Sequence, residues 1–315
     1  MRVLVAGGGG FIGSHLVDLL LGRGDEVVAI DSFVTGRRSN LSSARSWPGF
    51  RLVVHDVTEP LPDLGTFDAV LNLASPASPA DFARFPLEIL LVGSTGTRHL
   101  LELAGGQGSR FLQASTSEIY GDPLSHPQAE DYLGNVDPVG PRSCYDEAKR
   151  FGEAMASAHR RSLGTDTTIA RIFNTYGERM APADGRVVTS FIDQALRGEP
   201  LSVYGSGTQT RSFCHVSDQV AGLAALLESD VAGPVNIGNP TEVTMRGLAE
   251  MILDLTGSAS MIETVPLPPE RKGDPARRCP DISLARSVLG WEPVVGLRDG
   301  LLRMIDHFRS VESSG

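Results

Sequence analysis

The sequence of 315 residues contains only three cysteines, Cys144, Cys214 and Cys279, which lie far apart and form no CxxC pair. Such a small, odd number excludes a disulfide framework and offers no zinc-binding pattern. We therefore expect three unpaired thiols and no metal site.

Lysine is even scarcer than cysteine. Of the 28 Lys and Arg residues, only two, Lys149 and Lys272, are lysine. The 38 Asp and Glu residues leave a formal net charge of −10, which repels the phosphate backbone of nucleic acids and anionic lipid surfaces. We therefore expect no nucleic-acid partner.

Long hydrophobic runs are also missing. No apolar stretch approaches the roughly 20 residues that cross a bilayer, and the first strand-like run begins at Arg2, before any signal peptide would fit. We therefore expect a cytoplasmic protein with no membrane partner. With 41% hydrophobic and 21% charged residues, the chain has the composition of a globular protein.

The first half of the chain alternates strand-like runs with helical patterns. Strands are predicted at Arg2–Ala6, Glu26–Ile30, Arg51–His55, Phe67–Leu73, Arg110–Ala114 and Thr167–Ile172. Helices are predicted at Phe11–Leu21, Pro86–Ala104 and Ser143–Ser162. This α/β alternation predicts a Rossmann-type doubly wound parallel sheet, with ligands at the carboxyl ends of its strands.

After Asn174, segments rich in Gly and Pro separate four further helical patterns. These lie at Val187–Leu196, Val216–Leu227, Met245–Leu255 and Leu297–Phe308. We predict a sheet domain at 1–174 and a smaller C-terminal lobe at 175–315. A strand near 233–238 is expected to return to the first sheet.

Four glycines, Gly7–Gly10, join the first predicted strand to a helix that contains Phe11, Ile12 and Gly13. A pyrophosphate can approach the backbone N–H groups at a helix start only where no Cβ intrudes. Strand, glycine turn and helix together predict a dinucleotide site. Its register is open, because GxxGxxG from Gly7 and GxGxxG from Gly8 both fit.

Asp31 ends the second predicted strand, 18 residues after Gly13, close to the ~20 typical of a ribose-binding carboxylate. A carboxylate there binds the ribose hydroxyls and repels a 2′-phosphate, so NAD is favoured over NADP. Asp56 ends the third strand, where it could reach the adenine or simply cap the strand.

Tyr145 and Lys149 are four residues apart and share one face of a predicted helix. An ammonium about 4.5 Å from the phenol contributes ~3.7 kcal/mol at an effective dielectric of ~20. That is close to the ~4 kcal/mol that lowers a pKa near 10 by ~3 units. The pair predicts a tyrosine base, and an ordinary i,i+4 pair of side chains on the helix surface is the alternative.

The fifth predicted strand continues into a polar segment with three hydroxyls and one carboxylate. These side chains belong to Ser115, Thr116, Ser117 and Glu118. The carboxyl edge of a parallel sheet is where its active sites lie, so we expect them to frame a substrate together with Tyr145.

Longer motifs extend this pattern over nearly the whole chain. They are Ala74–Pro79, Ser115–Pro123, Arg142–Glu147, Ala170–Gly177, Asp184–Val188 and Val203–Arg211. Together they resemble the UDP-glucuronate decarboxylases, within the extended short-chain dehydrogenase/reductase family that acts on nucleotide sugars. The resemblance implies that the first domain binds NAD and that the lobe binds the UDP-sugar.

The resemblance also implies a reaction. UDP-glucuronate would be oxidised at C4, the 4-keto acid would lose CO₂, and the retained NADH would reduce the product to UDP-xylose. Tyr145 would act as base, assisted by Lys149 and by Ser115 or Thr116. Glu118 and Arg278 would position water and deliver a proton to C5.

Site residues are carried over position by position. The predicted catalytic residues are Tyr145, Lys149, Thr116, Ser117, Glu118 and Arg278. The predicted NAD-binding residues are Gly7, Gly10, Phe11, Ile12, Gly13, Asp31, Asp56, Val57, Leu73, Ala74, Ser75, Tyr145 and Lys149. The predicted UDP-sugar residues are Asn174, Arg179, Val188, Tyr204, Gln209 and Arg211.

Three other functions are compatible with many of the same residues. They are a UDP-4-keto-pentose synthase that releases NADH, a nucleotide-sugar 4-epimerase, and a non-catalytic NAD-binding regulator on the same fold. Glu118 argues against simple epimerisation, and the presence of Tyr145 and Lys149 argues against the regulator. Two residues depart from the pattern: Leu91 replaces a common lysine, and His215 replaces a common tyrosine. The resemblance further implies a homodimer.

Overall fold

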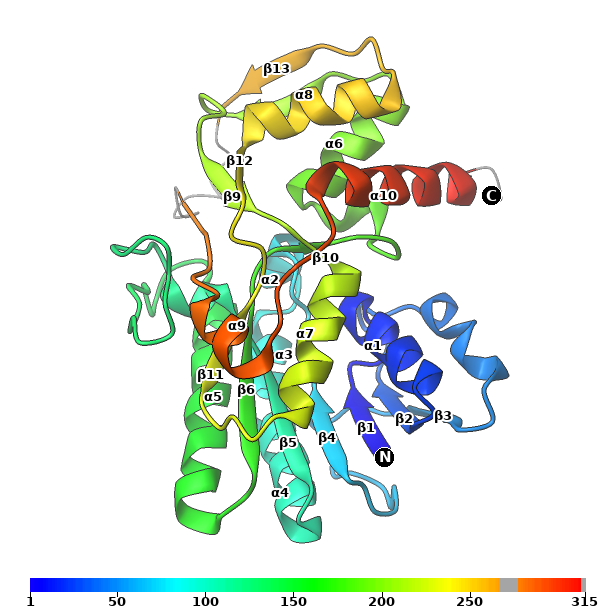
Figure 1. The fold of residues 1–315 in the computed structure, drawn as a ribbon, viewed down its shortest axis with the longest axis vertical. Coiled ribbons are helices and arrows are strands. Elements are labelled where there is room, and N and C mark those ends of the chain that lie inside the picture. Colours follow the sequence, from blue (N-terminus) through cyan, green and yellow to red (C-terminus); the bar gives the residue numbers. More distant parts are fainter. Residues whose placement is uncertain (267–276, 313–315) are drawn as a thin grey trace.

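The computed structural model describes residues 1–266 and 277–312, so Lys272 lies outside the described residues. A parallel seven-stranded sheet forms its larger part, in the order β11-β6-β5-β4-β1-β2-β3 (Figure 1). Its strands are β1 (Arg2–Ala6), β2 (Glu26–Asp31), β3 (Phe50–Val54), β4 (Ala69–Asn72), β5 (Arg110–Thr116), β6 (Thr167–Ile172) and β11 (Pro234–Ile237). The predicted Rossmann-type fold class is confirmed.

Helices cover both faces of this sheet. One face carries α1 (Phe11–Gly22), α7 (Val216–Glu228) and α9 (Ser283–Leu289); the other carries α3 (Pro86–Leu91), α4 (Thr97–Gln107) and α5 (Ser143–Leu163). Because side chains alternate along a strand, Val3 and Val5 pack toward α1 and α7, whereas Leu4 and Ala6 pack toward α4.

The single helix predicted at Pro86–Ala104 is divided in the structure. A π-helical turn at Val92–Gly96 lies between α3 and α4. At this turn the chain passes so close to α5 that a Cβ on Gly93 would lie 2.7 Å from the Cβ of Ala148. The turn therefore packs α3 and α4 tightly against the helix that carries Tyr145.

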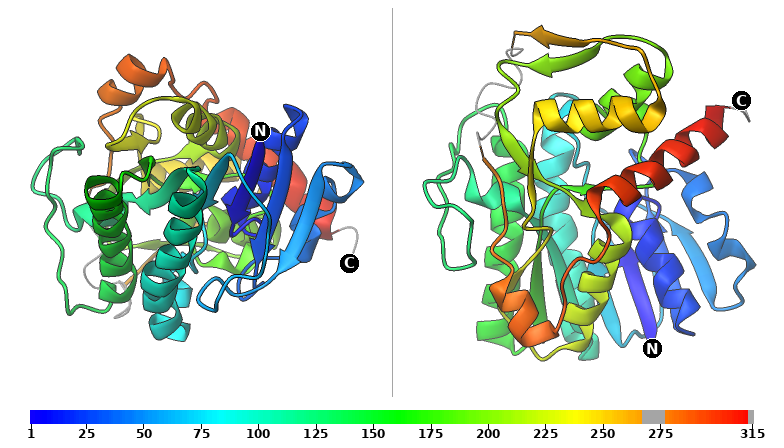
Figure 2. Two further views of the ribbon diagram at one scale, coloured as in Figure 1. Left: turned by 90° about the horizontal axis from the view of Figure 1, so that it is seen from below. Right: turned by 45° about the horizontal axis from the view of Figure 1, so that its top comes forward.

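The smaller lobe lies beyond the carboxyl ends of the strands (Figures 1 and 2). Its elements are α6 (Val187–Leu196), β8 (Leu201–Tyr204), β9 (Thr210–Ser212), β12 (Glu242–Thr244), α8 (Met245–Thr256), β13 (Ile262–Val265) and α10 (Leu297–Glu312). Side chains such as Phe191, Leu248 and Met304 form its own core. The short strands β7 (Thr175–Tyr176) and β10 (Cys214–His215) pair where the chain passes between the two parts.

Three elements after residue 174 pack with the sheet domain. β11 pairs with β6, α7 contacts α1, and α9 contacts β11. Val220, Leu223 and Ala285 accordingly belong to the same core as Val3. The sequence analysis expected only one returning strand, because periodicity shows that a helix is amphipathic and not which surface it covers.

In the part of the chain that the structure describes, no helix has the length and apolar character needed to cross a bilayer.

Candidate active site

The glycine turn between β1 and α1 has no room for side chains. Gly7 has φ = 78°, and a Cβ on it would lie 2.7 Å from the backbone carbon of Leu73. A Cβ on Gly13 would lie 2.1 Å from the carbonyl oxygen of Gly7. No side chain caps the start of α1, so its first N–H groups are available to an anion. The turn therefore fits a pyrophosphate.

Asp31 lies against this turn. Its Oδ2 accepts a hydrogen bond from the N–H of Gly9 (2.8 Å), and its Oδ1 accepts one from the N–H of Phe33 (2.7 Å). Burial raises the pKa of Asp31. Asn40, which the sequence analysis missed, also contacts the turn: its Nδ2 donates to the carbonyl oxygen of Gly9 (3.0 Å). Asp31 thus lies where a ribose next to the pyrophosphate would be.

The other predicted NAD-binding residues border the same turn or follow the neighbouring strands. Phe11 and Ile12 begin α1, and Leu73, Ala74 and Ser75 follow β4, with Leu73 in reach of Gly7. Asp56 and Val57 follow β3. Oδ1 of Asp56 accepts hydrogen bonds from the backbone N–H and the hydroxyl of Thr58 (2.9 and 2.8 Å). Asp56 therefore stabilises the turn that follows β3, and its contact with the adenine stays a prediction.

Tyr145 and Lys149 both lie buried in the first turns of α5, each with 7% of its surface exposed. The Nζ of Lys149 donates to the carbonyl oxygen of Ala114 (3.0 Å) and lies 5.7 Å from the centroid of the Tyr145 ring. Burial raises the pKa of Tyr145 to about 12, although a hydrogen bond with Thr116 and the charge of Arg186 oppose it.

We expected Lys149 to lower the pKa of Tyr145, and the structure shows the pKa raised instead. Burial acts on both groups: it also lowers the pKa of Lys149 to about 8. The sequence estimate counted the attraction between the charges and left out the cost of removing them from water.

Phe82, on the short helix α2 (Pro79–Arg84), stacks on the ring of Tyr145. The ring centroids are 4.9 Å apart and the planes are inclined by 19°. The guanidinium of Arg142 lies 5.4 Å from the centroid of the Phe82 ring. Phe82 thus holds the phenol ring in place by contact over its face. The sequence analysis missed Phe82, since it gives no motif of its own.

Because side chains alternate along β5, its last two hydroxyl groups, those of Ser115 and Thr116, lie on different faces of the strand. The hydroxyl of Ser115 donates to Oε1 of Glu153 on α5 (2.6 Å), so it is engaged away from the tyrosine. Thr116 forms the hydrogen bond with Tyr145. Ser117 is buried and begins η4 (Ser117–Tyr120). Of the two hydroxyls considered as partners of the phenol, the structure places Thr116 there.

Glu118 lies between two arginines. Its Oε2 accepts hydrogen bonds from Nη2 of Arg278 (2.7 Å) and Nη2 of Arg142 (2.6 Å), and its Oε1 accepts a further one from Nη1 of Arg278. Burial alone would raise the pKa of Glu118, but the charges of Arg278 and Arg142 lower it to about 2. The carboxylate is therefore ionised, and Arg142 joins the predicted site as a residue that the sequence analysis had not singled out.

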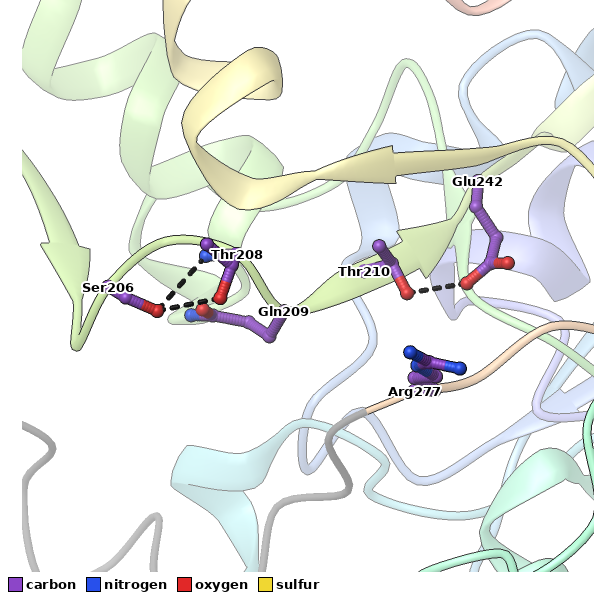
Figure 3. Close-up of a pocket in the computed structure, with 6 residues that line it drawn as sticks. All are labelled: Ser206, Thr208, Gln209, Thr210, Glu242 and Arg277. Atoms are coloured by element: carbon purple, nitrogen blue, oxygen red, sulfur yellow. Dashed lines mark hydrogen bonds between the residues drawn. The ribbon is translucent and has the colours of Figure 1, made fainter.

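A cavity of about 570 Å³ opens at the lobe (Figure 3). Its lining includes Gln209, with Ser206, Thr208, Thr210, Glu242 and Arg277. Tyr204 and Arg211 are close in the chain: Gln209 donates through Nε2 to the carbonyl oxygen of Tyr204 (2.9 Å), and Arg211 follows Thr210 on β9. Of the predicted UDP-sugar residues, only Gln209 lines this cavity, and Arg277 lies here whereas Arg278 binds Glu118.

The remaining three substrate predictions are dispersed. Val188 is buried in α6, and Asn174 follows β6, where its carbonyl oxygen accepts from the N–H of Cys214 (2.9 Å). Arg179 forms an ion pair with Asp18 of α1, on the sheet domain. The structure therefore does not bring Arg179 to the cavity that Gln209 lines, and the functional roles of all these residues stay predictions.

The two departures from the motif pattern lie in different surroundings. Leu91 is 50% exposed on α3. His215 is 2% exposed and caps α7, with Nδ1 2.8 Å from the Ser217 hydroxyl and Nε2 3.4 Å from Oε2 of Glu178. The imidazole of His215, close to this carboxylate, lowers the pKa of Glu178 to about 2. His215 therefore serves the junction between the two parts of the molecule.

Known proteins are similar to this chain in sequence and in fold. The sequence profile of the NAD dependent epimerase/dehydratase family matches residues 3–238. UDP-glucuronic acid decarboxylase 5 of Arabidopsis thaliana is 52% identical over 310 residues, which cover 98% of this chain and 89% of that protein. UDP-glucuronic acid decarboxylase 1 of Danio rerio is 50% identical over 307 residues, which cover 98% of this chain and 72% of that protein.

Solved structures agree in fold at lower identity. UDP-glucose 4-epimerase from Thermotoga maritima, with UDP-glucose, has a TM-score of 0.91 at 29% identity and covers 99% of this chain and 100% of its own. UDP-glucuronic acid 4-epimerase from Bacillus cereus, in complex with UDP-glucuronic acid and NAD, has a TM-score of 0.89 at 28% identity, with the same coverage.

Proposed function

Because the chain belongs to the NAD dependent epimerase/dehydratase family, we propose that it uses NAD to convert UDP-glucuronate into UDP-xylose and CO₂. About 50% identity to UDP-glucuronic acid decarboxylases over 98% of the chain is the observation that carries this proposal. The two arginines that bind Glu118 support it. Their guanidinium groups outnumber the single carboxylate, which leaves positive charge where an anionic sugar acid must bind.

NAD fits the cradle formed by Gly7, Gly13 and the uncapped start of α1, and Asp31 would bind its ribose. When bound, it supplies the acceptor for the hydride from C4 and returns that hydride later in the cycle. The chain's own residues handle the protons. Tyr145 takes the proton of the C4 hydroxyl in its ionised form, which the hydrogen bond with Thr116 and the positive charge of Lys149 favour against the effect of burial.

Oxidation at C4 prepares the loss of CO₂. With a carbonyl at C4, the electron pair left by the departing carboxylate is delocalised onto the C4 oxygen as an enolate. Hydrogen-bond donors at the end of β5 would stabilise that oxygen, and the hydrogen bond between Thr116 and Tyr145 supports Thr116 as one of them. The same two residues then serve the re-reduction of C4.

Incubation of the purified protein with UDP-glucuronate and NAD⁺ tests the function. We expect UDP-xylose, identified by NMR, together with one CO₂ per turnover and no net NADH. Tyr145→Phe, which keeps the ring and removes the proton acceptor, should abolish both products. Unchanged UDP-glucuronate with no CO₂ would refute the proposal. Stoichiometric NADH with a 4-keto pentose would instead identify the synthase, and UDP-galacturonate would identify an epimerase.

We also propose a homodimer and a cytoplasmic location. Four apolar side chains on the packed helices α3 and α5 support the dimer, because they are at least 40% exposed: Leu87, Leu90, Leu91 and Phe151. A second copy of the chain is the partner that would cover them. The composition supports the location, which cell fractionation tests.

A further inference from the structure

Gln128 is a buried amide to which the proposed reaction assigns no task. It lies in the segment between η4 and α5, and 1% of its surface is exposed. Its backbone binds the chain that follows Arg278. The N–H of Gln128 donates to the carbonyl oxygen of Cys279 (2.9 Å), and its carbonyl oxygen accepts from the N–H of Asp281 (2.8 Å). Gln128 therefore pairs with Pro280 as one residue of a parallel sheet pairs with another.

The side chain of Gln128 adds a third hydrogen bond to the same segment, next to Arg278. Its Oε1 accepts from the N–H of Cys279 (2.9 Å), and its Nε2 donates to the carbonyl oxygen of Ser125 (2.7 Å). Because Cys279 is only 5% exposed, removal of this acceptor would leave a buried N–H group without a partner. The Gln128 amide thus fixes the peptide group that joins Arg278 to Cys279.

Asn236 on β11 holds the same contact from the sheet. It is fully buried, and its Nδ2 donates to the carbonyl oxygens of Gln128 (2.9 Å) and Asp281 (3.1 Å). Its Oδ1 accepts from the hydroxyl of Tyr120 (2.8 Å), which belongs to η4. The same short helix carries Glu118. Both sides of the arginine–carboxylate pair at Glu118 are therefore anchored to one buried network.

The position of Arg278 matters because of the way in which it binds Glu118. Its Nη1 and Nη2 donate to the two different oxygens of the carboxylate. Such a bidentate pair depends on alignment as well as on distance. A long arginine side chain keeps that alignment only when its own backbone is held in place.

We propose that Gln128 is a positioning residue that holds the backbone at Cys279, so that Arg278 stays on Glu118 and presents its positive charge to the sugar acid. The inference rests on the proposed decarboxylase function, in which UDP-glucuronate is the substrate and UDP-xylose is the product without the carboxylate. Loss of the Gln128 amide should therefore weaken the binding of UDP-glucuronate and leave the binding of UDP-xylose unchanged.

Gln128→Met tests the proposal, since it keeps the length of the side chain and removes the acceptor for Cys279. Gln194→Met is the matched control, because Oε1 of Gln194 accepts from the N–H of Ser202 (3.1 Å) within the lobe. Calorimetry on protein loaded with NADH measures sugar-nucleotide binding without turnover. We expect Gln128→Met to bind UDP-glucuronate about tenfold more weakly and UDP-xylose like the wild type. Gln194→Met should bind both like the wild type.

A double substitution shows whether Gln128 acts through Arg278. In an Arg278→Met background, Gln128→Met should change the affinity for UDP-glucuronate by less than twofold, because the group that it positions is already missing. A purely structural role would weaken the binding of both sugar nucleotides, or would add the same loss in both backgrounds.

Acid unfolding supplies a readout that needs no substrate. Burial raises the pKa of Glu118, and the charges of Arg278 and Arg142 lower it to about 2, so the wild type loses stability as pH falls from 4.5 toward 2. With Arg278 displaced, the pKa of Glu118 moves back toward 4.5 and this loss shrinks. We expect Glu118→Gln to change the loss at most half as much in a Gln128→Met background as in the wild type.

Unchanged affinity of Gln128→Met for UDP-glucuronate, or an equal loss of affinity for UDP-xylose, would overturn the proposal. So would the full tenfold loss in the Arg278→Met background. If Gln128→Met does not fold, Gln128→Asn, whose amide is one methylene too short to reach Cys279, carries the same measurements and outcomes. Failure of the decarboxylase function looks different, because the wild-type protein would then release no CO₂ from UDP-glucuronate, and acid unfolding alone would decide the role of Gln128.

Discussion

Two carboxyl groups at the end of β5 and the start of α5 are buried, and their surroundings drive them in opposite directions. Glu118 receives hydrogen bonds from two guanidinium groups, and its pKa falls to about 2. Asp146 receives none at Oδ1 from any residue that the structure describes, and its pKa rises to about 7. Neighbouring charges therefore decide the state of Glu118, and burial decides that of Asp146.

The lowered pKa of Glu118 predicts an acid-sensitive contribution to stability. The pKa is below the unfolded value of 4.5, so the stabilisation is complete above pH 4.5 and is lost as pH falls toward about 2. A shift from 4.5 to about 2 corresponds to ~3 kcal/mol. We expect the free energy of unfolding, measured with urea, to fall by that much more in the wild type than in Glu118→Gln over this range.

Glu250→Gln on α8 is the control for this comparison, because the side chain of Glu250 is 60% exposed and its ion pair with Arg246 is at the surface. Its stability should follow the wild-type curve at every pH. Parallel curves for Glu118→Gln and the wild type would contradict the electrostatic account of the Glu118 cluster.

At the scale of elements, α1 depends on glycine at one end and not at the other. A Cβ on Gly13 would lie 2.1 Å from the carbonyl oxygen of Gly7, whereas a Cβ on Gly22 would meet nothing within 4 Å. Replacing Gly13 or Gly22 by alanine therefore separates an effect on the glycine turn from an effect on the stability of α1.

We expect Gly13→Ala to reduce NAD binding by at least tenfold, because the turn must shift to admit the methyl group. Gly22→Ala should bind NAD like the wild type and should be slightly more stable, since alanine favours helix. Isothermal titration calorimetry with NAD⁺ and thermal unfolding measure the two effects. Equal NAD affinity in both variants would show that the turn is not the binding site.

Patterns that are local in the sequence were predictable, and contacts between distant segments were not. Strand-helix periodicity located β1 to β6, and the glycine turn with Asp31 is contained in the first 31 residues. The Glu118 cluster joins residues 24 and 160 positions apart, so only the folded chain shows that Arg142 and Arg278 meet there. The effect of burial on Tyr145 likewise depends on surroundings that spacing does not report.

At the scale of the whole molecule, the exposed apolar side chains of α3 and α5 predict an oligomer. Leu87 is 68% exposed and Phe151 is 48% exposed, on helices that pack against each other. We expect Leu87→Glu combined with Phe151→Glu to convert a dimer into a monomer in light scattering, because buried charges oppose association. Val294→Glu, at an 83% exposed position after α9, is the control and should leave the dimer intact. A wild-type monomer would refute the dimer.

Because α7, β11 and α9 pack with the sheet domain, the polypeptide passes between the sheet domain and the lobe several times. Neither part is a continuous stretch of sequence. A gene cut after codon 174 would encode a sheet without its edge strand and without two of its covering helices. The sheet domain and the smaller lobe therefore cannot be separated by a single cut in the gene, and neither can be replaced by one recombination event.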